Sequence, residues 1–324
     1  MSGPAREPMA QGEPRGRHAA AEQPADLPGG PVDIGDPGRA AVTVVPRPDC
    51  RFPFHNDIVA DVARFPGDGE LHLLAASVRG LSHLYYGKVR QDSFGHLVTS
   101  DGRWLVAAVA DGVSAGQHSH VAAEIVSQMG CRLLVAQLEE RPPAELDWRA
   151  VLDGVADEIV GHARRRLALV DSTLLDVARQ LAATALFAVV PIVPADSGER
   201  TVHVMSLGDT SAWVLRPDAA PAWDSLQVVK NRGSVLASSM TMALPGVPAK
   251  MAPPVTTTLR PGEALVLMSD GVGDPLGGGT GEVGEYLADA WREPPDPFTF
   301  IAQVGFRRRS YDDDRTVLAV WPVQ

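Results

Sequence analysis

The chain has 324 residues, of which 45% are apolar, so it can bury the core of one large domain. Its formal net charge of −11 argues against nucleic acid or an anionic membrane as the main partner. No apolar run reaches the ~20 residues of a membrane span, and the N-terminus lacks the apolar segment of a secretory signal. With only Cys50 and Cys131, neither a disulfide framework nor a cysteine zinc site is implied. We therefore expect a cytoplasmic protein.

The first 48 residues are rich in proline, glycine, alanine and charge, with scarcely any large apolar side chain before Val42. Such a segment cannot bury enough surface to offset the entropy lost on ordering. We therefore predict a disordered tail over residues 1–48 and a folded domain over residues 52–324, whose order begins between Phe52 and Leu71.

The folded part alternates between groups of strands and groups of helices. Apolar periodicity predicts the first strands at Leu71–Val78, Ser93–Thr99 and Trp104–Ala110, with a hairpin turn at Ser100-Asp101-Gly102. Apolar residues at helical spacing predict long helices at about Ser119–Leu138 and Trp148–Val170. Later strands are predicted at Ala185–Val190, Val202–Leu207, Ala212–Leu215, Leu226–Val229, Ala264–Met268 and Val317–Trp321, with a helical segment between Glu282 and Trp291. This order favours α+β layers over a parallel βαβ sheet.

Acidic residues stand at the ends of three predicted strands. Asp111-Gly112 and Asp270-Gly271 each close an apolar run, and the run Asp312-Asp313-Asp314 precedes the last one. Hard cations such as magnesium and manganese require carboxylate oxygens of this kind. If these strand ends converge, the chain has a metal-dependent hydrolase site. Each Asp-Gly pair alone is common turn chemistry.

Six landmarks taken together resemble a known family. In chain order they are Gln91-Asp92, Val109-Ala110-Asp111-Gly112, Thr184, Leu207-Gly208-Asp209-Thr210, Met268-Ser269-Asp270-Gly271 and Asp314-Arg315-Thr316-Val317. Their order and spacing resemble the PPM family of metal-dependent serine/threonine phosphatases, the type 2C protein phosphatases, from about Leu71 to Trp321. The stretch Gly80-Leu81-Ser82-His83 is similar to the actinobacterial branch. The resemblance implies a four-layer α-β-β-α sandwich of two antiparallel sheets flanked by helices, with two metals at one end.

The resemblance also implies a set of metal ligands. Asp111 would bridge two Mn²⁺ or Mg²⁺ ions, and the backbone carbonyl of Gly112 would bind one of them. Asp270 and Asp314 would hold the other ion, and Asp92 would orient metal-bound water or bind through it. Two cations ~3.5–4 Å apart generate a hydroxide nucleophile and neutralise phosphoryl oxygens, so no covalent intermediate is needed.

Some of these assignments leave alternatives open. Asp209 would help Asp270 to hold a weaker third ion, but a turn stabilised by its own side chain explains it equally well. Asp312 and Asp313 can shift the register of the last ligand. Four further features are interpreted as structural or solvated: Thr184, His83, the pair His118 and His120, and the run Arg307-Arg308-Arg309.

The residues that would handle substrate depart from the family pattern. An arginine that binds phosphate in well-studied members falls near Gly87, so Arg90 or Lys88, or else Arg79, must take its place. Arginine is favoured because its planar fork grips phosphate oxygens in a bidentate manner. Val113 stands where those members have a histidine that is a candidate general acid, so the proton donor is not identified.

The resemblance implies metal-dependent hydrolysis of phosphoserine and phosphothreonine on proteins by a dimetal-activated water, opposing a Ser/Thr kinase. The alternative is a catalytically weak module of the same fold that binds a phosphoprotein. A small-molecule phosphatase is a third interpretation. The full set of aspartates favours an enzyme, whereas Gly87 and Val113 keep the binding module open.

Overall fold

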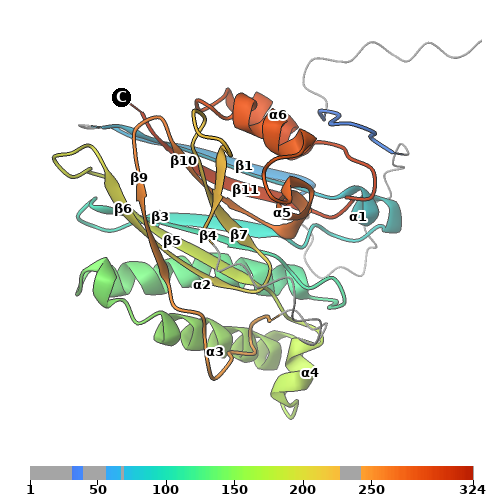
Figure 1. Ribbon diagram of the computed structural model, residues 1–324. Helices are drawn as coiled ribbons and strands as arrows, with labels where there is room; N and C mark the ends of the chain where they lie inside the picture. The colour runs from blue at the N-terminus through green and yellow to red at the C-terminus, as the bar shows by residue number, and fades with distance from the viewer. Residues whose placement is uncertain (1–30, 39–55, 67–68, 227–241, 324) are drawn as a thin grey trace, which may run out of the picture. The chain divides into compact units, whose positions relative to one another are not determined.

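The computed structural model describes residues 31–38, 56–66, 69–226 and 242–323. Within these residues two antiparallel sheets lie at the centre, and helices cover the outer face of each sheet (Figure 1). This arrangement confirms the predicted α+β sandwich of two antiparallel sheets flanked by helices.

The first sheet has six strands in the order β1-β2-β11-β10-β7-β8. Their bounds are Ile58–Phe65 (β1), Leu71–Val78 (β2), Ser211–Leu215 (β7), Trp223–Ser225 (β8), Ala264–Met268 (β10) and Arg315–Pro322 (β11). The last strand lies between β2 and β10, so that Val317 faces Ala76 on one side and Met268 on the other. This pairing brings residues 312–314, which precede β11, next to the segments that leave β2 and β10.

The second sheet has five strands in the order β3-β4-β5-β6-β9. Their bounds are Ser93–Val98 (β3), Trp104–Ala110 (β4), Ala185–Pro191 (β5), Arg200–Leu207 (β6) and Val255–Leu259 (β9). Strand β4 is buried on both faces, because Leu105, Ala107 and Val109 pack toward the other sheet. Its alternate residues Val106, Ala108 and Ala110 pack toward the helices, as the two-residue period of a strand requires.

The helices have the bounds Leu81–Tyr86 (α1), Ser119–Leu138 (α2), Trp148–Arg166 (α3), Leu174–Ala178 (α4), Asp270–Leu276 (α5), Glu282–Ala290 (α6) and Pro297–Val304 (α7). Helices α2 and α3 cover the five-stranded sheet (Figure 1). Helix α2 lies so close to β5 that a Cβ on Gly130 would be 2.2 Å from the ring of Phe187. In the described part of the chain, α2 is also long and apolar enough to cross a membrane, but half of that stretch is buried inside the fold. Burial of this kind is typical of a core helix.

The predicted strands and long helices are found close to their expected bounds. The exception is Leu226–Val229, because the strand lies earlier, at Trp223–Ser225, and residues 227–229 are outside the described residues. Strands β1 and β9 were not predicted. No residue of β1 is buried although six of its eight residues are apolar, and three of the five residues of β9 are threonines.

Most of the predicted tail over residues 1–48 lies outside the described residues. Its described part, residues 31–38, packs on the folded domain instead of being disordered. Ile34 is only 5% exposed and joins the core beneath α7, and the Val32 carbonyl accepts a hydrogen bond from the Arg307 N–H at 2.7 Å. Ile34 alone could not reveal this packing in the sequence, because the composition of the surrounding segment is that of a disordered tail.

Candidate metal centre

Three predicted ligands from different parts of the sequence meet at one end of the sandwich. Asp111 follows β4, Asp209 lies in the turn between β6 and β7, and Asp270 begins α5 directly after β10. Carboxylate oxygens of these three residues all lie within 4.8 Å of one another. Because β4 and β10 belong to different sheets, the cluster forms only when the two sheets stack.

Backbone contacts fix the position of Asp111. Its N–H donates to the Thr184 hydroxyl at 3.0 Å, and its carbonyl accepts from the Thr184 N–H at 2.8 Å. Thr184 therefore has the structural role that we predicted for it. Gly112 packs so closely that a Cβ there would lie 2.7 Å from the Gln91 carbonyl oxygen and 2.8 Å from the Ser119 backbone. The Asp-Gly pair thus joins β4, α2 and the Gln91-Asp92 segment.

Asp92 is buried beside this cluster. Its carboxyl group lies near the hydroxyls of Ser269 and Thr316, at the end of β10 and in β11, and its Oδ2 has no hydrogen-bond partner among the described residues. Burial, together with the charges of Asp314 and Asp270, raises the pKa of Asp92 to about 8. The structure therefore places Asp92 near the predicted ligands from both sheets.

Asp111 and Asp270 in the cluster also hold their protons more tightly than isolated carboxyl groups do. Burial and the charges of Asp92 and Asp270 raise the pKa of Asp111 well above its ordinary value. Burial also raises the pKa of Asp270 to about 6, although its hydrogen bond with Asp111 opposes this shift. Mutual repulsion of this kind is relieved by a nearby cation. An all-oxygen donor set of this charge fits hard divalent cations such as Mn²⁺ or Mg²⁺.

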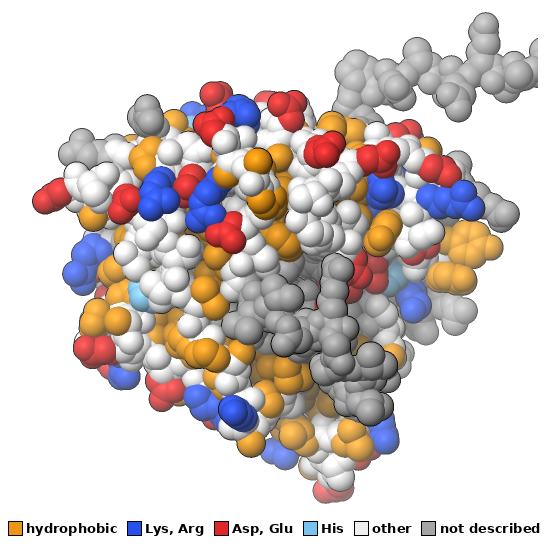
Figure 2. All heavy atoms as spheres, viewed as in Figure 1, with side chains coloured by type: hydrophobic (Ala, Val, Ile, Leu, Met, Phe, Trp, Pro, Cys, Tyr) orange, Lys and Arg blue, Asp and Glu red, His pale blue; other side chains and the backbone are white. Residues whose placement is uncertain are grey.

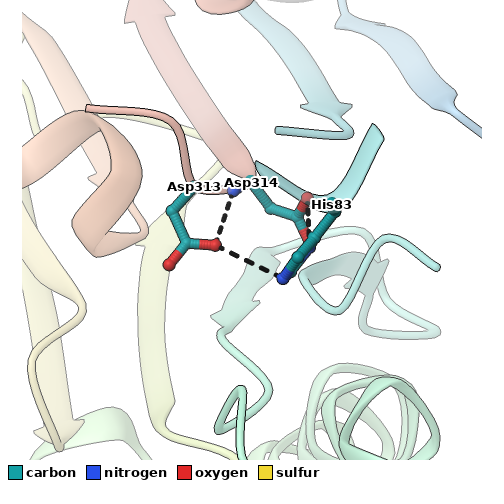
Figure 3. Close-up of side chains that lie close together, drawn as sticks. All are labelled: His83, Asp313 and Asp314. Atoms are coloured by element: carbon teal, nitrogen blue, oxygen red, sulfur yellow. Dashed lines mark hydrogen bonds and ion pairs between the residues drawn. The ribbon is translucent and has the colours of Figure 1, made fainter. Parts of the chain in front are cut away.

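Asp314 differs from the sequence-based prediction that it is a metal ligand (Figure 3). One of its carboxylate oxygens accepts from the Gly80 N–H at 2.7 Å and lies 2.9 Å from His83 Nδ1, and the other accepts from the Gln91 N–H. Its side chain is only 2% exposed. The carboxylate oxygens of Asp314 are therefore committed to protein donors that hold the start of α1 and the Gln91-Asp92 segment.

Asp313, the residue before Asp314, is not buried, and its charge acts on the acidic cluster. Its side chain is 47% exposed, and its charge raises the pKa values of Asp111 and Asp270. Neighbouring residues at the start of a strand point to opposite sides, so a shift of one residue exchanges a site-facing carboxylate for a buried one. With three consecutive aspartates, the sequence alone does not show which one faces the site and which one is buried.

His83 lies between the two aspartates, with Nδ1 2.9 Å from Asp314 and Nε2 3.8 Å from Asp313 (Figure 3). Burial lowers the pKa of His83, but the hydrogen bond and charge of Asp314 outweigh this effect, so the pKa is raised. By distance alone these three residues form a second group able to hold a metal ion. The raised pKa favours the protonated form of His83, and a protonated histidine is a poor metal ligand and a good hydrogen-bond donor.

Asp274 is a member of the centre that sequence reasoning missed. It lies one helical turn after Asp270 in α5. Burial and the charges of Asp209 and Asp313 raise the pKa of Asp274. The signal was present, because residues four apart share one face of a helix, but a helix beginning at Asp270 was not predicted.

Arg90 does not face the cluster as a free phosphate-binding group. Its Nε donates to the Asn56 carbonyl at 3.2 Å, and its Nη1 donates to the Ser77 hydroxyl at 2.7 Å and to the Asp92 carbonyl. Burial lowers the pKa of Arg90. These contacts give Arg90 a structural role beside Asp92, and its predicted contact with substrate stays a prediction.

Lys88 is exposed and is close enough to His83 for its charge to lower the pKa of that residue. Its predicted contact with substrate phosphate stays a prediction. The Arg79 guanidinium is buried and donates to the His83 carbonyl at 2.9 Å and to Asp57 at 3.0 Å, which is a structural arrangement.

Two glycines bring three backbone segments together behind the carboxylates. A Cβ on Gly271 would lie 1.9 Å from the Asp314 carbonyl oxygen, and a Cβ on Gly80 would lie 2.2 Å from the Asp313 carbonyl carbon. The starts of α1, α5 and β11 are therefore in direct backbone contact. This contact sets the spacing between Asp270 and Asp313.

Comparison with known proteins shows which family the chain matches. Residues 79–297 match the family described as protein phosphatase 2C. No curated protein sequence is similar enough to count as a match.

Solved structures with a similar fold include bacterial phosphatases. The PP2C phosphatase domain of SpoIIE from Bacillus subtilis, with a fragment of its regulatory domain, is 14% identical, covering 82% of this chain and 69% of that one with a TM-score of 0.49. The catalytic domain of the serine threonine protein phosphatase PstP, in complex with two manganese ions, is 18% identical, covering 78% and 99% with a TM-score of 0.46. PppA, a regulatory component of T6SS in Pseudomonas aeruginosa, is 14% identical, covering 82% and 98% with a TM-score of 0.43.

Proposed function

Because the chain belongs to the protein phosphatase 2C family, we propose that it hydrolyses phosphoserine and phosphothreonine on proteins. The observation that carries the proposal is the cluster of Asp111, Asp209 and Asp270, whose carboxylate oxygens lie within 4.8 Å of one another. A group of repelling carboxylates, two half-buried and one exposed, has no structural benefit of its own, and it fits the binding of divalent cations.

We propose that the ligands are Asp111, Asp270 and Asp313, together with the backbone carbonyl of Gly112. Asp92 holds or orients water beside them. When bound, two Mn²⁺ or Mg²⁺ ions supply Lewis-acid neutralisation of the phosphoryl oxygens and lower the pKa of the attacking water. Asp209 and Asp274 supply the oxygens for a third, weaker ion at the mouth of the site.

The chain's own residues position this chemistry. Thr184 fixes Asp111 through two backbone contacts, and the hydroxyls of Ser269 and Thr316 lie near the Asp92 carboxyl group. Lys88 is the exposed cation that we propose for holding the substrate phosphate. An ammonium group on a flexible stem acts there as a point charge.

The biological setting is part of the same proposal. A phosphoprotein phosphatase opposes a Ser/Thr kinase, so a cognate kinase is the expected source of its substrates. The net charge of −11 supports a cytoplasmic protein that acts on proteins and not on nucleic acid.

The deciding experiment measures hydrolysis of an aryl phosphate with Mn²⁺, with Mg²⁺ and after exhaustive chelation, followed by phosphoserine peptides. We expect activity only with added metal, and its loss in Asp111→Asn. Asp218→Asn is the matched control, because Asp218 is 92% exposed and pairs with Arg292. Undiminished hydrolysis after chelation would refute the proposal. A wild-type protein that binds phosphopeptide without hydrolysing it would favour the binding module.

A further inference from the structure

A groove of about 510 Å³ lies beside the candidate metal centre. One wall is α1, through Leu81, Tyr85 and Tyr86, and the opposite wall is the loop of residues 308–312. Residues 36–38 line a third side. We call this feature the α1 groove.

Both main walls of the α1 groove continue directly into the metal centre. Ser82 lines the groove and its N–H donates to the Asp312 carbonyl at 2.8 Å, while the next residue, His83, contacts Asp314. Asp312 also lines the groove and is followed by the site-facing Asp313. One residue of extended chain spans about 3.5 Å, so residues flanking a phosphoserine at the carboxylates reach the groove within a few positions.

The groove presents aromatic surface to a ligand. Tyr85 and Tyr86 are 59% and 68% exposed, and their rings meet edge to face with centroids 5.0 Å apart. Two adjacent exposed tyrosines are typical of protein contact surfaces, because each combines an apolar ring with a polar tip.

Of the three arginines in the loop Arg307–Arg309, Arg309 is the least committed. Arg307 makes a two-point ion pair with Asp33, and Arg308 bonds both Glu282 and the Ile34 carbonyl. Arg309 is 72% exposed and has one ion pair, at 3.1 Å, with Asp36. An exposed single ion pair stabilises a fold very little, so Arg309 can exchange its partner at low cost.

The chain itself shows which kind of segment suits Arg309. The Arg309 N–H donates to the Asp36 carbonyl at 2.7 Å while its guanidinium holds the Asp36 carboxylate. Asp36, Pro37 and Gly38 thus form an acidic segment that lines the groove. Acidic and basic side chains are interspersed on the side of the molecule that carries α1 and α6, so single pairs and not a net field decide selectivity (Figure 2).

We propose that the α1 groove binds the part of a phosphoprotein substrate that flanks its phosphorylated residue. Arg309 selects flanking segments that carry an acidic residue, in competition with Asp36, and Tyr85 and Tyr86 pack against the segment. This inference rests on the proposed phosphatase function and adds the class of substrate that the site prefers.

The first test compares two phosphoserine peptides of equal length, one with glutamates and one with lysines beside the phosphoserine, and an aryl phosphate that cannot reach the groove. We expect the wild-type protein to prefer the acidic peptide in kcat/KM by about tenfold, a usual size for charge complementarity. Arg309→Ala should lower kcat/KM for the acidic peptide about fivefold and leave the aryl phosphate rate within twofold. Arg260→Ala is the matched control, since Arg260 is 52% exposed and pairs with Glu199 at 2.8 Å.

The second test uses the competing carboxylate. Asp36→Asn should raise kcat/KM for the acidic peptide about threefold and have no effect when Arg309→Ala is also present, as coupling between two contacting groups predicts. Asp33→Asn is its control, because Asp33 pairs with Arg307 and does not line the groove. Tyr85→Ala with Tyr86→Ala should weaken both peptides and spare the aryl phosphate.

Preference for the basic peptide, or an acidic-peptide kcat/KM unchanged by Arg309→Ala, would overturn the proposal. Failure of the phosphatase function gives a different pattern, because the aryl phosphate would then also resist hydrolysis. In that case fluorescence anisotropy of the same two peptides tests the groove directly. Equal affinities in wild type and Arg309→Ala would overturn it there too.

Discussion

Two groups of close-packed titratable residues lie at the same end of the sandwich and are built in opposite ways. Asp111, Asp209 and Asp270 form the acidic cluster, in which carboxylates face one another. His83 and Asp314 form the latch, in which one carboxylate receives two backbone N–H groups and lies against an imidazole. Together with Asp313, the latch residues lie as close to one another as the three aspartates of the acidic cluster, so by distance alone either set of three could hold a metal ion.

The difference between them lies in what the carboxylate oxygens face. In the latch every strong acceptor position is directed at a donor from the protein, so a cation would have to displace those donors. In the acidic cluster burial and repulsion raise the pKa values of Asp111 and Asp270, which shows that negative charge there is not balanced by protein donors. Proximity alone therefore does not identify a metal site, whereas the balance of donors and acceptors does.

The largest expected effect tests the acidic cluster. Asp111→Asn should lower kcat for an aryl phosphate by about a thousandfold or more, because it removes a charged oxygen from the proposed ligand set. The folded state should survive, and thermal unfolding without metal should occur at a higher temperature, since one source of repulsion is gone. Steady-state kinetics and circular dichroism measure the two quantities. A near-normal rate would remove Asp111 from the centre.

The latch should respond in stability. Asp314→Ala leaves the N–H groups of Gly80 and Gln91 without their acceptor, and loss of a buried charged acceptor costs about 2–4 kcal/mol of unfolding free energy. Urea unfolding of the metal-free protein measures the change. Asp312→Ala is the control, because Asp312 is exposed and should shift stability by less than about 0.5 kcal/mol. An equally small shift in both variants would mean that the latch does not hold the fold.

A third change separates the neighbouring aspartates. Asp313→Asn should weaken Mn²⁺ binding by about tenfold or more while leaving metal-free stability nearly unchanged. Asp314→Asn should do the opposite: it should lower metal-free stability and change Mn²⁺ binding little. Isothermal titration of Mn²⁺ gives the affinity without reference to catalysis. If Asp314→Asn reduces Mn²⁺ affinity more than Asp313→Asn does, Asp314 is the ligand, as the sequence predicted.

The acidic cluster also predicts how the metal-free protein responds to pH. An unfolded aspartate loses its proton near pH 4, whereas folded Asp92 keeps it until about pH 8. Between these values the folded state binds more protons at Asp92, so the contribution of Asp92 to stability is largest below pH 4 and is lost as pH rises toward 8. Asp92→Asn should flatten this fall by more than about 1 kcal/mol, measured as the difference from wild type in unfolding at pH 5 and pH 8. Parallel curves for the two proteins would contradict the burial of this carboxyl group.

The smallest effect concerns Arg90, to which sequence and structure give different roles. Since its Nε and Nη1 donate to backbone and hydroxyl acceptors, Arg90→Ala should change KM for an aryl phosphate by less than about twofold and act on stability instead. Lys88→Ala should be the variant that raises KM. A raised KM in Arg90→Ala with unaltered stability would reinstate arginine as the phosphate ligand.

The sequence was sufficient for most of the fold because its core elements have strong periodicity. Strands β4 and β10 are uninterrupted apolar runs, and α2 and α3 repeat apolar residues over about five turns. Strand β1 was missed although six of its eight residues are apolar, because they do not alternate with polar residues as in a half-buried strand. The packed segment of residues 31–38 was missed for a different reason. Its partner Arg307 lies more than 270 positions further along the chain, so no local pattern indicates the contact.

The site residues were predictable where a motif contains only one aspartate that can be the ligand. Asp111 and Asp270 each precede a single glycine at the end of an apolar run, and the structure brings both into the cluster. The run Asp312–Asp314 has three registers, and only the contacts of Gly80, His83 and Gln91 show which aspartate is buried. Asp274 depends on where α5 begins, and that start is set by the contact between Gly271 and the Asp314 backbone.

The glycines at 80 and 271 also limit how this centre can be transplanted. A designer who copies only the carboxylates onto another scaffold would keep the ligands and lose their spacing, because any side chain at either position meets the backbone before β11 at 1.9–2.2 Å. The smallest portable unit is therefore the three-segment junction, from residue 80 to 92, from 268 to 274 and from 312 to 316, together with Asp111 and Gly112. A saturation library over that junction should retain glycine at 80 and 271, whereas Gly278, outside the junction, has open space around it and accepts other residues.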